Sequence, residues 1–369
     1  MRSLLSAAKG PYALTPFIPI AIVLDLIGAG SVLVFATSAL GVIPTAALMG
    51  RATEELAARA GPGIGGLLNV TFGNAPELII ALFALNKGLQ EVVKASIIGS
   101  IVGNTLLVLG AAMFVGGLGR DRQRFDQTAA GAQSSMLLLA AAALIMPAIF
   151  ELVEGKGLPS PGSELVDYGS TVETLSVAVA VILLLSYVAG LVFSLKTHRG
   201  LFNPGHDDPG PGHHAETWTV RKSIFALAIA GVAVGVMSEI LVGSITEAAD
   251  KVGLSQFFVG VIIVAIVGNA AEHWVAVLVA RKDKMDLSVN IAVGSSAQVA
   301  LFVAPVLVFA SFVLGPHPMA LVFNGFELGA ILIAILIANH VTGEGESNWY
   351  EGLQLMAVYA VLAASFFAA

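Results

Sequence analysis

Two glutamates lie in strongly apolar stretches of the sequence, where their carboxylates could bind cations or protons. A carboxylate at membrane depth is costly, so it marks a functional site by default. Two of them at matching places in two halves are typical of a transporter whose ion site lies where internal repeats meet. Each glutamate ends a Gly-Asn-Ala-x-Glu segment, and a Gly-Ser pair follows each at the same distance: Gly73–Glu77 with Gly99-Ser100, and Gly268–Glu272 with Gly294-Ser295.

The side chains beside the glutamates are oxygen ligands. Asn74 and Asn269 supply amide oxygens that can accept a hydrogen bond or bind a cation. Pro76 lacks a backbone N–H, so a carbonyl one turn earlier, near Phe72, is predicted to lose its partner. These hard ligands favour Ca²⁺ over copper or zinc, with Mn²⁺, Mg²⁺ and Na⁺ as alternatives. We therefore predict two residues that bind the metal ion or protons, Glu77 and Glu272.

The helix after each signature adds polar side chains. Ser100 and Asn104 share a face at i, i+4 spacing, and Ser295 and Gln298 share one at i, i+3 spacing. Because these helices are otherwise apolar, the polar stripes must face other helices. Ordinary interhelical contacts are the alternative interpretation, since small polar residues often hold membrane helices together. We predict six residues that line an ion pathway: Asn74, Asn269, Ser100, Asn104, Ser295 and Gln298.

Such a site could exchange ions by simple competition. Two carboxylates brought together away from water repel each other, and both burial and like charge favour their protonated forms. A divalent cation would neutralise both groups and displace the protons. Competition for one site is therefore sufficient for antiport, without a separate proton pathway.

Three other acidic residues are candidates for gating or a proton relay. Glu54 lies near a helix end, where a solvated charge is also ordinary, and Glu239 and Glu327 lie within predicted helices. A packed, hydrogen-bonded role is the alternative for both of these. His273 adjoins Glu272 but points to another side of the helix, so we interpret it as structural.

The composition places the chain in a membrane. Of its 369 residues, 57% are hydrophobic and 12% are charged, and the mean hydropathy is +0.88. A soluble domain carries about a quarter charged residues. The absence of cysteine excludes disulfides, thiolate metal sites and thiol nucleophiles. The net charge of −7 gives no basic surface for nucleic acid.

The hydrophobic pattern predicts an all-α membrane protein of about eleven transmembrane helices. A span needs about 20 mostly apolar residues, and the first apolar run is interpreted as a retained helix rather than a signal peptide. Turn residues are predicted to separate spans at Gly61-Pro62, Pro159–Gly162 and Gly343–Asn348. The expected helices are 12–29, 31–58, 62–86, 90–118, 130–150, 168–196, 220–249, 254–280, 286–314, 317–340 and 350–368.

The distribution of positive charge orients these helices. With the N-terminus in the cytoplasm, most of the 18 lysines and arginines fall at cytoplasmic ends. The helices that carry Glu77 and Glu272 then run in opposite directions, as expected of inverted repeats. We predict a first helix at 1–30, a first repeat at 31–197 (helices 2–6), a cytoplasmic linker at 198–218, a second repeat at 219–369 (helices 7–11), and an external C-terminus.

The motifs resemble those of the cation/proton exchanger (CAX) family, within the Ca²⁺:cation antiporter superfamily, over roughly residues 12–368. Asn74-Ala75 and Asn269-Ala270 stand where Na⁺/Ca²⁺ exchangers usually have a Ser/Thr-rich signature, which favours the proton-coupled branch. The matching segments are Gly50–Glu54, Gly61–Leu78, Lys94–Asn104, Thr197–Gly200, Ser238-Glu239, Gly268–His273, Gly294–Gln298 and Ser347–Trp349.

The resemblance implies one helix plus two inverted five-helix repeats, with Glu77 and Glu272 as the central Ca²⁺ and proton carboxylates. It also implies that the six polar residues above line the pathway, and that the second and seventh helices, with Glu54 and Glu239, form a gating bundle. Eukaryotic members often carry an acidic segment in the central loop. The loop here is short and contains histidines, so regulation by an acidic segment is not expected.

We therefore predict a secondary antiporter in a prokaryotic cell (inner) membrane that exports cytosolic Ca²⁺ in exchange for H⁺ by alternating access. The alternatives are a Na⁺-coupled or Mn²⁺-preferring exchanger and a passive cation channel. The sequence contains no protease or hydrolase motif of an intramembrane enzyme, and no cofactor is expected beyond Ca²⁺ and H⁺ as transported substrates. The expected partners are these ions and the lipid bilayer, and a homo-oligomer is compatible with the sequence.

Overall fold

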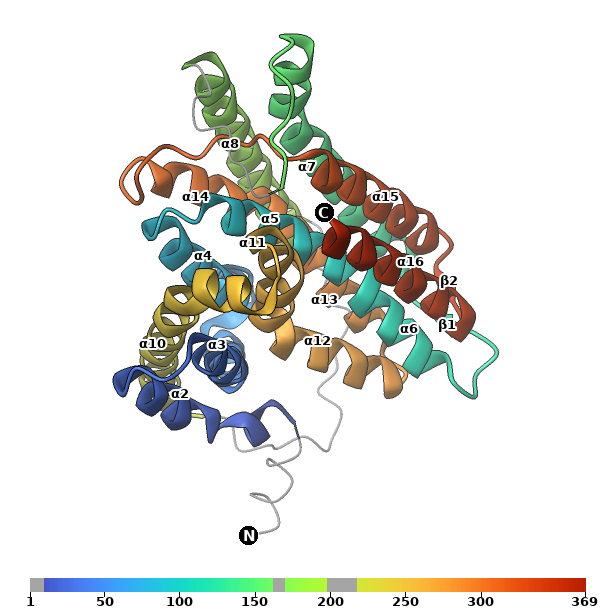
Figure 1. Ribbon diagram of the computed structural model, residues 1–369. Helices are drawn as coiled ribbons and strands as arrows, with labels where there is room; N and C mark the ends of the chain where they lie inside the picture. The colour runs from blue at the N-terminus through green and yellow to red at the C-terminus, as the bar shows by residue number, and fades with distance from the viewer. Residues whose placement is uncertain (1–9, 162–169, 198–217) are drawn as a thin grey trace.

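The computed structural model describes residues 10–161, 170–197 and 218–369 (Figure 1). The linker predicted at 198–218, except Trp218, and the basic residues at the extreme N-terminus lie outside the described residues. Within them, nine helices are long and apolar enough to cross a membrane, and two shorter apolar helices accompany them. The protein is therefore an all-α membrane protein with about the number of apolar helical segments that the sequence predicts.

The first half of the chain contains the signature with Glu77. A π-helical turn, η2, joins α5 and α6 into one continuous rod. The elements are η1 (Pro11–Leu14), α2 (Phe17–Leu26), α3 (Ser31–Gly73), α4 (Ala75–Asn86), α5 (Gln90–Val102), η2 (Gly103–Val108), α6 (Leu109–Gly117), β1 (Gln123–Arg124), α7 (Gln127–Val153), α8 (Ser170–Val192) and η3 (Phe193–Thr197).

The second half repeats this pattern of joined helices. The π-helical turns η4 and η5 link α11 to α12 and α13 to α14. The elements are α10 (Val220–Val252), α11 (Gln256–Phe258), η4 (Val259–Val264), α12 (Ala265–Arg281), α13 (Met285–Gln298), η5 (Val299–Val303), α14 (Ala304–Ser311), α15 (Gly325–Thr342), β2 (Glu346–Ser347) and α16 (Trp349–Ala368).

Two helix boundaries differ from the sequence-based expectation. The turn predicted at Gly61-Pro62 is wrong, because α3 continues through it to Gly73. The chain breaks instead at Asn74, whose φ of −94° and ψ of 17° are not helical, and Pro76 then lies in the first turn of α4. Proline is well tolerated there because the first N–H groups of a helix have no intrahelical partner.

The helix predicted from residue 317 begins only at Gly325. The preceding apolar segment, Met319–Phe323, is buried but has no regular secondary structure. Side chains of other helices satisfy its backbone: Ser311 Oγ accepts the Met319 N–H at 2.7 Å, Ser176 Oγ accepts the Leu321 N–H at 3.0 Å, and Lys94 Nζ donates to the Val322 carbonyl at 3.3 Å. An irregular backbone between apolar helices is tolerated because it is enclosed by protein.

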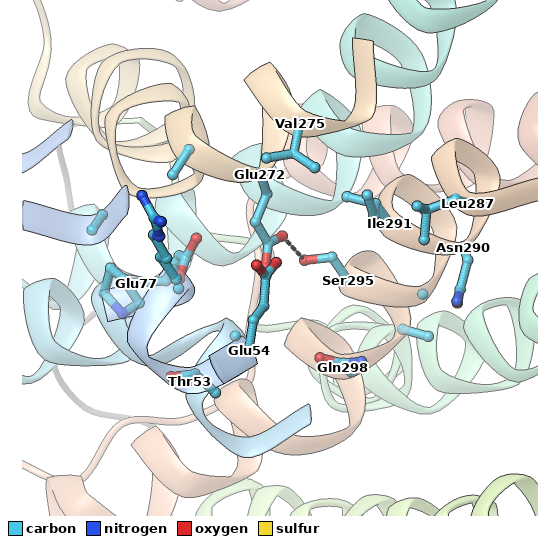
Figure 2. Close-up of a pocket in the computed structure, with 18 of the residues that line it drawn as sticks. Thr53, Glu54, Glu77, Glu272, Val275, Leu287, Asn290, Ile291, Ser295 and Gln298 are labelled. Atoms are coloured by element: carbon cyan, nitrogen blue, oxygen red, sulfur yellow. Dashed lines mark hydrogen bonds between the residues drawn. The ribbon is translucent and has the colours of Figure 1, made fainter. Parts of the chain in front are cut away.

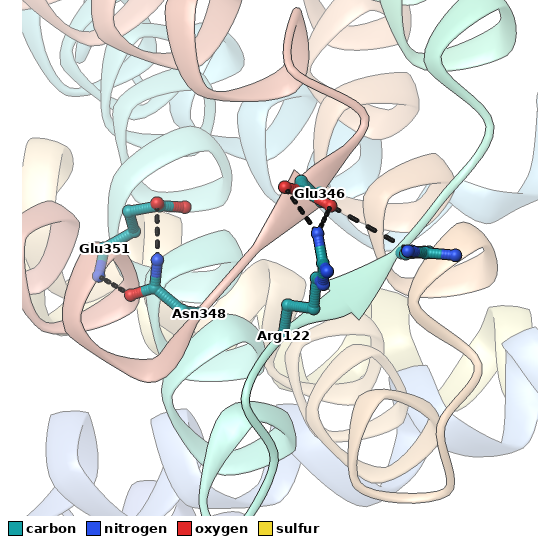
Figure 3. Close-up of polar contacts among 5 residues, drawn as sticks. Arg122, Glu346, Asn348 and Glu351 are labelled. Atoms are coloured by element: carbon teal, nitrogen blue, oxygen red, sulfur yellow. Dashed lines mark hydrogen bonds and ion pairs between the residues drawn. The ribbon is translucent and has the colours of Figure 1, made fainter.

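The connections between helices gather at two ends of the bundle. At one end β1 and β2 pair antiparallel, Arg122 contacts Glu346 at 3.0 Å, and Asn348 caps α16 (Figure 3). Arg120 also donates to the Arg281 carbonyl at this end, at 3.2 Å. We call it the Arg-rich end, defined by Arg120, Arg122, Arg124, Arg281, Lys282 and Lys284.

The opposite end brings together the connections before α5 and after α14. Gln90 Nε2 donates to the His317 carbonyl at 2.5 Å, and Pro316 lies against Gly88. The two ends thus hold the sets of loops that the orientation analysis assigns to the two sides of a membrane.

Two helical rods form the centre of the molecule. Within their most apolar windows, 83% of the α5–α6 rod (Gln90–Gly117) and 78% of the α13–α14 rod (Met285–Ser311) is buried, against 22% of α16. These rods carry the Ser/Asn and Ser/Gln stripes, so the stripes face protein rather than lipid. In Figure 1, α2, α3 and α10 lie together on one side of these rods, and α15 and α16 lie on the other.

Candidate ion-binding site

The two signature segments have different backbones. In the first half, α3 ends at Gly73 and α4 starts at Ala75, so Glu77 lies in the first turn of a new helix. In the second half, α12 runs without a break through Gly268 and Glu272. The Phe72 carbonyl, predicted to be left without a partner, accepts the N–H of Asn74. A helix N-terminus favours a negative charge, so the break gives Glu77 an electrostatic environment that Glu272 lacks.

The two segments pack against each other, and each glycine accommodates the glutamate of the other segment. A Cβ atom on Gly268 would lie 3.2 Å from Glu77 Cγ, and a Cβ atom on Gly73 would lie 3.4 Å from Glu272 Oε1. The structure therefore brings Glu77 and Glu272 together in the way the inverted signatures predict. The glycines matter because a side chain at either position would narrow the space around the carboxylates.

Asn74 of the first signature is held by two side chains of α13. Its Nδ2 donates to Gln298 Oε1 at 2.6 Å, and its Oδ1 lies 2.9 Å from Ser295 Oγ. The same Ser295 hydroxyl lies 2.7 Å from Glu272 Oε2. Ser295 thus connects the amide of one half to the carboxylate of the other.

Asn269 of the second signature has equivalent partners on the α5 rod. Its Nδ2 donates to Ser100 Oγ at 3.0 Å and to the Ala265 carbonyl at 2.9 Å. Its Oδ1 accepts from Asn104 Nδ2 at 3.4 Å. All six residues predicted to line the pathway therefore belong to two similar hydrogen-bonded groups, one built on Asn74 and the other on Asn269.

A cavity of about 870 Å³ reaches both glutamates. Glu54 of α3 also lines it, and Figure 2 shows its side chain pointing toward Glu272 and Ser295. Leu287, in the first turn of α13, also belongs to the wall, so the cavity extends from the carboxylates toward the Arg-rich end. One oxygen of Glu77, Oε2, is buried without a hydrogen-bond partner.

The other two acidic candidates lie elsewhere. Glu239 is exposed on α10 and is not part of the cavity wall. Glu327 is buried at the start of α15, where it forms a capping box with Asn324. That cap gives Glu327 a packed, hydrogen-bonded role, which is the structural alternative to a proton relay.

Two amides missed by the sequence analysis also line the cavity. Gln133 of α7 donates through Nε2 to Asn290 Oδ1 of α13 at 2.5 Å. Asn290 stands two helical turns before Gln298, on the same face, so extending the stripe of α13 backwards could have found it. Gln133 is a lone polar residue on an apolar face, and only the fold shows where it points.

The site offers a cation two carboxylates together with neutral oxygen groups. Among the residues that the structure describes, no cluster of three or more histidines, aspartates or glutamates could hold a metal ion. The residues suited to hold a hard cation are therefore Glu77 and Glu272, with amide and hydroxyl oxygens nearby.

The chain matches the family described as sodium/calcium exchanger protein over residues 30–196 and 222–368. It is 44% identical over 364 residues to a Ca(2+)/H(+) antiporter of Synechocystis sp., with 95% of each chain covered. It is 43% identical over 351 residues to the Ca(2+)/H(+) antiporter ChaA of Bacillus subtilis, covering 95% of this chain and 96% of that one.

Solved structures agree with these matches. The structure of native YfkE superposes with a TM-score of 0.81 at 39% identity, covering 97% of this chain and 100% of that chain. An H⁺/Ca²⁺ exchanger named CAX superposes with a TM-score of 0.69 at 14% identity, covering 97% and 91%, which shows the shared fold alone. The resemblance inferred from the two signatures is confirmed, and the chain belongs to the sodium/calcium exchanger protein family.

Proposed function

We propose that this chain is a secondary antiporter that exports Ca²⁺ from the cytoplasm in exchange for H⁺. The observation that carries the proposal is the pair of glutamates from two inverted signatures, each packed on the glycine of the other, at the inner limit of a cavity. Its relatives from Synechocystis and Bacillus subtilis, named Ca(2+)/H(+) antiporters, support the same choice of ions.

Competition at the two carboxylates provides the coupling. With Ca²⁺ bound, Glu77 and Glu272 are neutralised by the metal, and with Ca²⁺ released they are neutralised by protons. The empty, doubly ionised site is unfavourable because two like charges would then lie together away from water. The protein therefore crosses between its two states carrying one kind of ion or the other, which is the condition for exchange.

Access from one side at a time follows from the packing. The cavity extends from the carboxylates along α13 as far as Leu287, toward the Arg-rich end. In the opposite direction, α5 packs so closely on η4 that a Cβ atom on Gly99 would overlap the Val261 carbonyl oxygen. In the alternate state of an inverted-repeat transporter the two repeats exchange these roles. We assign residues 31–197 and 219–369 as the repeats.

The positive charges assign the Arg-rich end to the cytoplasm. The N-terminus then lies in the cytoplasm, the C-terminus outside, and the cavity faces the cytoplasm. Glu54, which points toward Glu272 from the cavity wall, is a carboxylate that an entering cation would meet on its way to the paired glutamates. We assign Glu54 to gating or to delivery of the cation to the paired glutamates. The exposed Glu239 of α10 is kept as a candidate only for gating, because it lies in the bundle that α3 and α10 form.

The test is ⁴⁵Ca²⁺ uptake into proteoliposomes with an acidic interior and no Na⁺. Uptake above that of empty vesicles, lost when a protonophore with a K⁺/valinomycin clamp removes the pH gradient, is the expected result. Glu247→Gln is a matched control, because Glu247 is 67% exposed on α10 and pairs only with Lys251 among the ion pairs identified. Uptake that does not depend on the pH gradient would indicate a channel. Uptake that occurs only with internal Na⁺ would indicate the sodium-coupled alternative.

A further inference from the structure

The two halves of the site differ at the residue after each glutamate. Leu78 follows Glu77, whereas His273 follows Glu272. From its place in the sequence, His273 is expected to be a structural residue that points to another side of the helix than Glu272. In the structure its Nε2 lies 2.9 Å from Asn104 Oδ1, so it contacts one of the predicted pathway residues directly.

The direction of this hydrogen bond follows from its neighbours. Asn104 turns its Nδ2 toward Asn269 Oδ1, at 3.4 Å, so its own Oδ1 faces the imidazole ring. The ring Nε2 must then be the donor. Asn269 in turn donates to Ser100. A chain of hydrogen bonds therefore runs from His273 through Asn104 to the asparagine of the second signature.

Asn74 in the first half needs no histidine of this kind, because its hydrogen-bond partner Gln298 has a longer side chain than Asn104. Gln298 reaches Asn74 at 2.6 Å, whereas Asn104, one methylene shorter, reaches Asn269 only at 3.4 Å. A long hydrogen bond orients an amide weakly. A second contact on the other side of the Asn104 amide restores the fixed orientation that Gln298 achieves through its length.

We propose that His273 is a positioning residue of the cation site, acting through Asn104 to hold Asn269 and Ser100 in place. It keeps the Asn104 amide from rotating, so that Asn269 Oδ1 always meets an N–H group and the Asn269 amide keeps one orientation beside the carboxylates. The proposal rests on the proposed function, since its effect is on cation affinity.

The test compares His273→Leu, which copies the first repeat, with His273→Gln, which keeps an N–H donor. His273→Leu is expected to raise the half-saturating Ca²⁺ concentration for ⁴⁵Ca²⁺ uptake about tenfold, with the maximal rate within about twofold of wild type. His273→Gln should recover most of the affinity. His340→Leu, on the surface of α15 with its side chain 80% exposed, is the control and should match wild type.

A double-mutant cycle with Asn104→Ala separates positioning from general packing. If His273 acts through Asn104, His273→Leu should have no further effect on affinity in the Asn104→Ala background, because coupled residues are not additive. Additive effects, a wild-type affinity for His273→Leu, or a loss of maximal rate that His273→Gln does not recover would each overturn the proposal.

A separate measurement distinguishes this proposal from the transport function. Wild-type protein that shows no gradient-driven uptake would refute the proposed antiport. Equilibrium binding of ⁴⁵Ca²⁺ to the detergent-purified variants would still decide the role of His273, since weaker binding by His273→Leu alone supports it. Wild-type protein that binds no Ca²⁺ in either assay would overturn both.

Discussion

Gly99 and Gly294 occupy equivalent positions in the two Gly-Ser motifs, yet the structure predicts opposite results when each is replaced by alanine. A Cβ atom on Gly99 would overlap the backbone carbonyl of Val261 in η4 and lie 2.8 Å from the Cβ of Ala265. A Cβ atom on Gly294 would meet only the ends of two amide side chains, Asn290 Oδ1 at 3.2 Å and Gln133 Nε2 at 3.4 Å.

The size of each effect follows from what must move. Gly99→Ala forces two backbones apart, which places it at the upper end of overpacking costs, about 3 kcal/mol. Alanine regains up to about 1 kcal/mol over glycine within a helix, so the net loss of stability is about 2 kcal/mol. At Gly294 the amides can shift by a few tenths of an ångström. The higher helix propensity of alanine then offsets the cost of this contact, so the net change in stability is near zero.

Thermal unfolding of the two variants in detergent, followed by size-exclusion chromatography, measures this difference. We expect Gly99→Ala to lower the melting temperature by several degrees and Gly294→Ala to leave it unchanged. If the alternate state packs α13 as tightly as α5 is packed here, Gly294→Ala should nevertheless slow Ca²⁺ uptake. Equal melting temperatures for the two variants would refute the reasoning that only one repeat is closed in this state.

Three further predictions concern the carboxylates and their partners. Glu77→Gln and Glu272→Gln keep the shape of the side chain but remove its charge, so each should abolish H⁺-driven ⁴⁵Ca²⁺ uptake while the folded protein elutes normally. Normal exchange by either variant would exclude that residue from the site. Ser295→Ala removes the hydroxyl that contacts both Asn74 and Glu272, so it should raise the half-saturating Ca²⁺ concentration by about five- to tenfold. Ser100→Ala should raise it less. Equal effects of the two variants would contradict the asymmetry of the two hydrogen-bonded groups. Because protons and Ca²⁺ compete for the same carboxylates, lowering the pH should weaken ⁴⁵Ca²⁺ binding to the purified protein, and binding that does not change with pH would contradict competition.

The sequence predicts which polar side chains lie together, because membrane burial makes polar residues conspicuous. A glutamate in an apolar membrane helix usually faces a protein-lined interior rather than lipid. The same holds for a serine with an asparagine one turn later. The predicted stripes of Ser100 with Asn104 and of Ser295 with Gln298 therefore lie where the spacing places them, beside the signature asparagines. The same argument extended along α13 would have identified Asn290.

The features that sequence analysis predicts incorrectly depend on partners far away in the chain. Hydropathy cannot distinguish a helix from the irregular segment Met319–Phe323, whose backbone bonds to Ser176, Ser311 and Lys94 from three other helices. Turn residues at Gly61-Pro62 do not end α3. The short pairing of β1 with β2 joins connections from both halves of the chain, and no local pattern indicates it.

The difference between the two signatures fits the proposed alternation of a repeated sequence between two conformations. Pro76 has no N–H and the first segment is broken at Asn74, whereas Ala271 stands at the equivalent place and α12 is continuous. Both segments still place their glutamates together, because each glutamate packs on the glycine of the other segment. The carboxylates can thus stay paired while the surrounding helices differ, with α13 lining an open cavity and α5 closed against η4. A transporter that opens alternately to two sides needs this combination, in which a fixed ion site lies between two repeats of unequal packing.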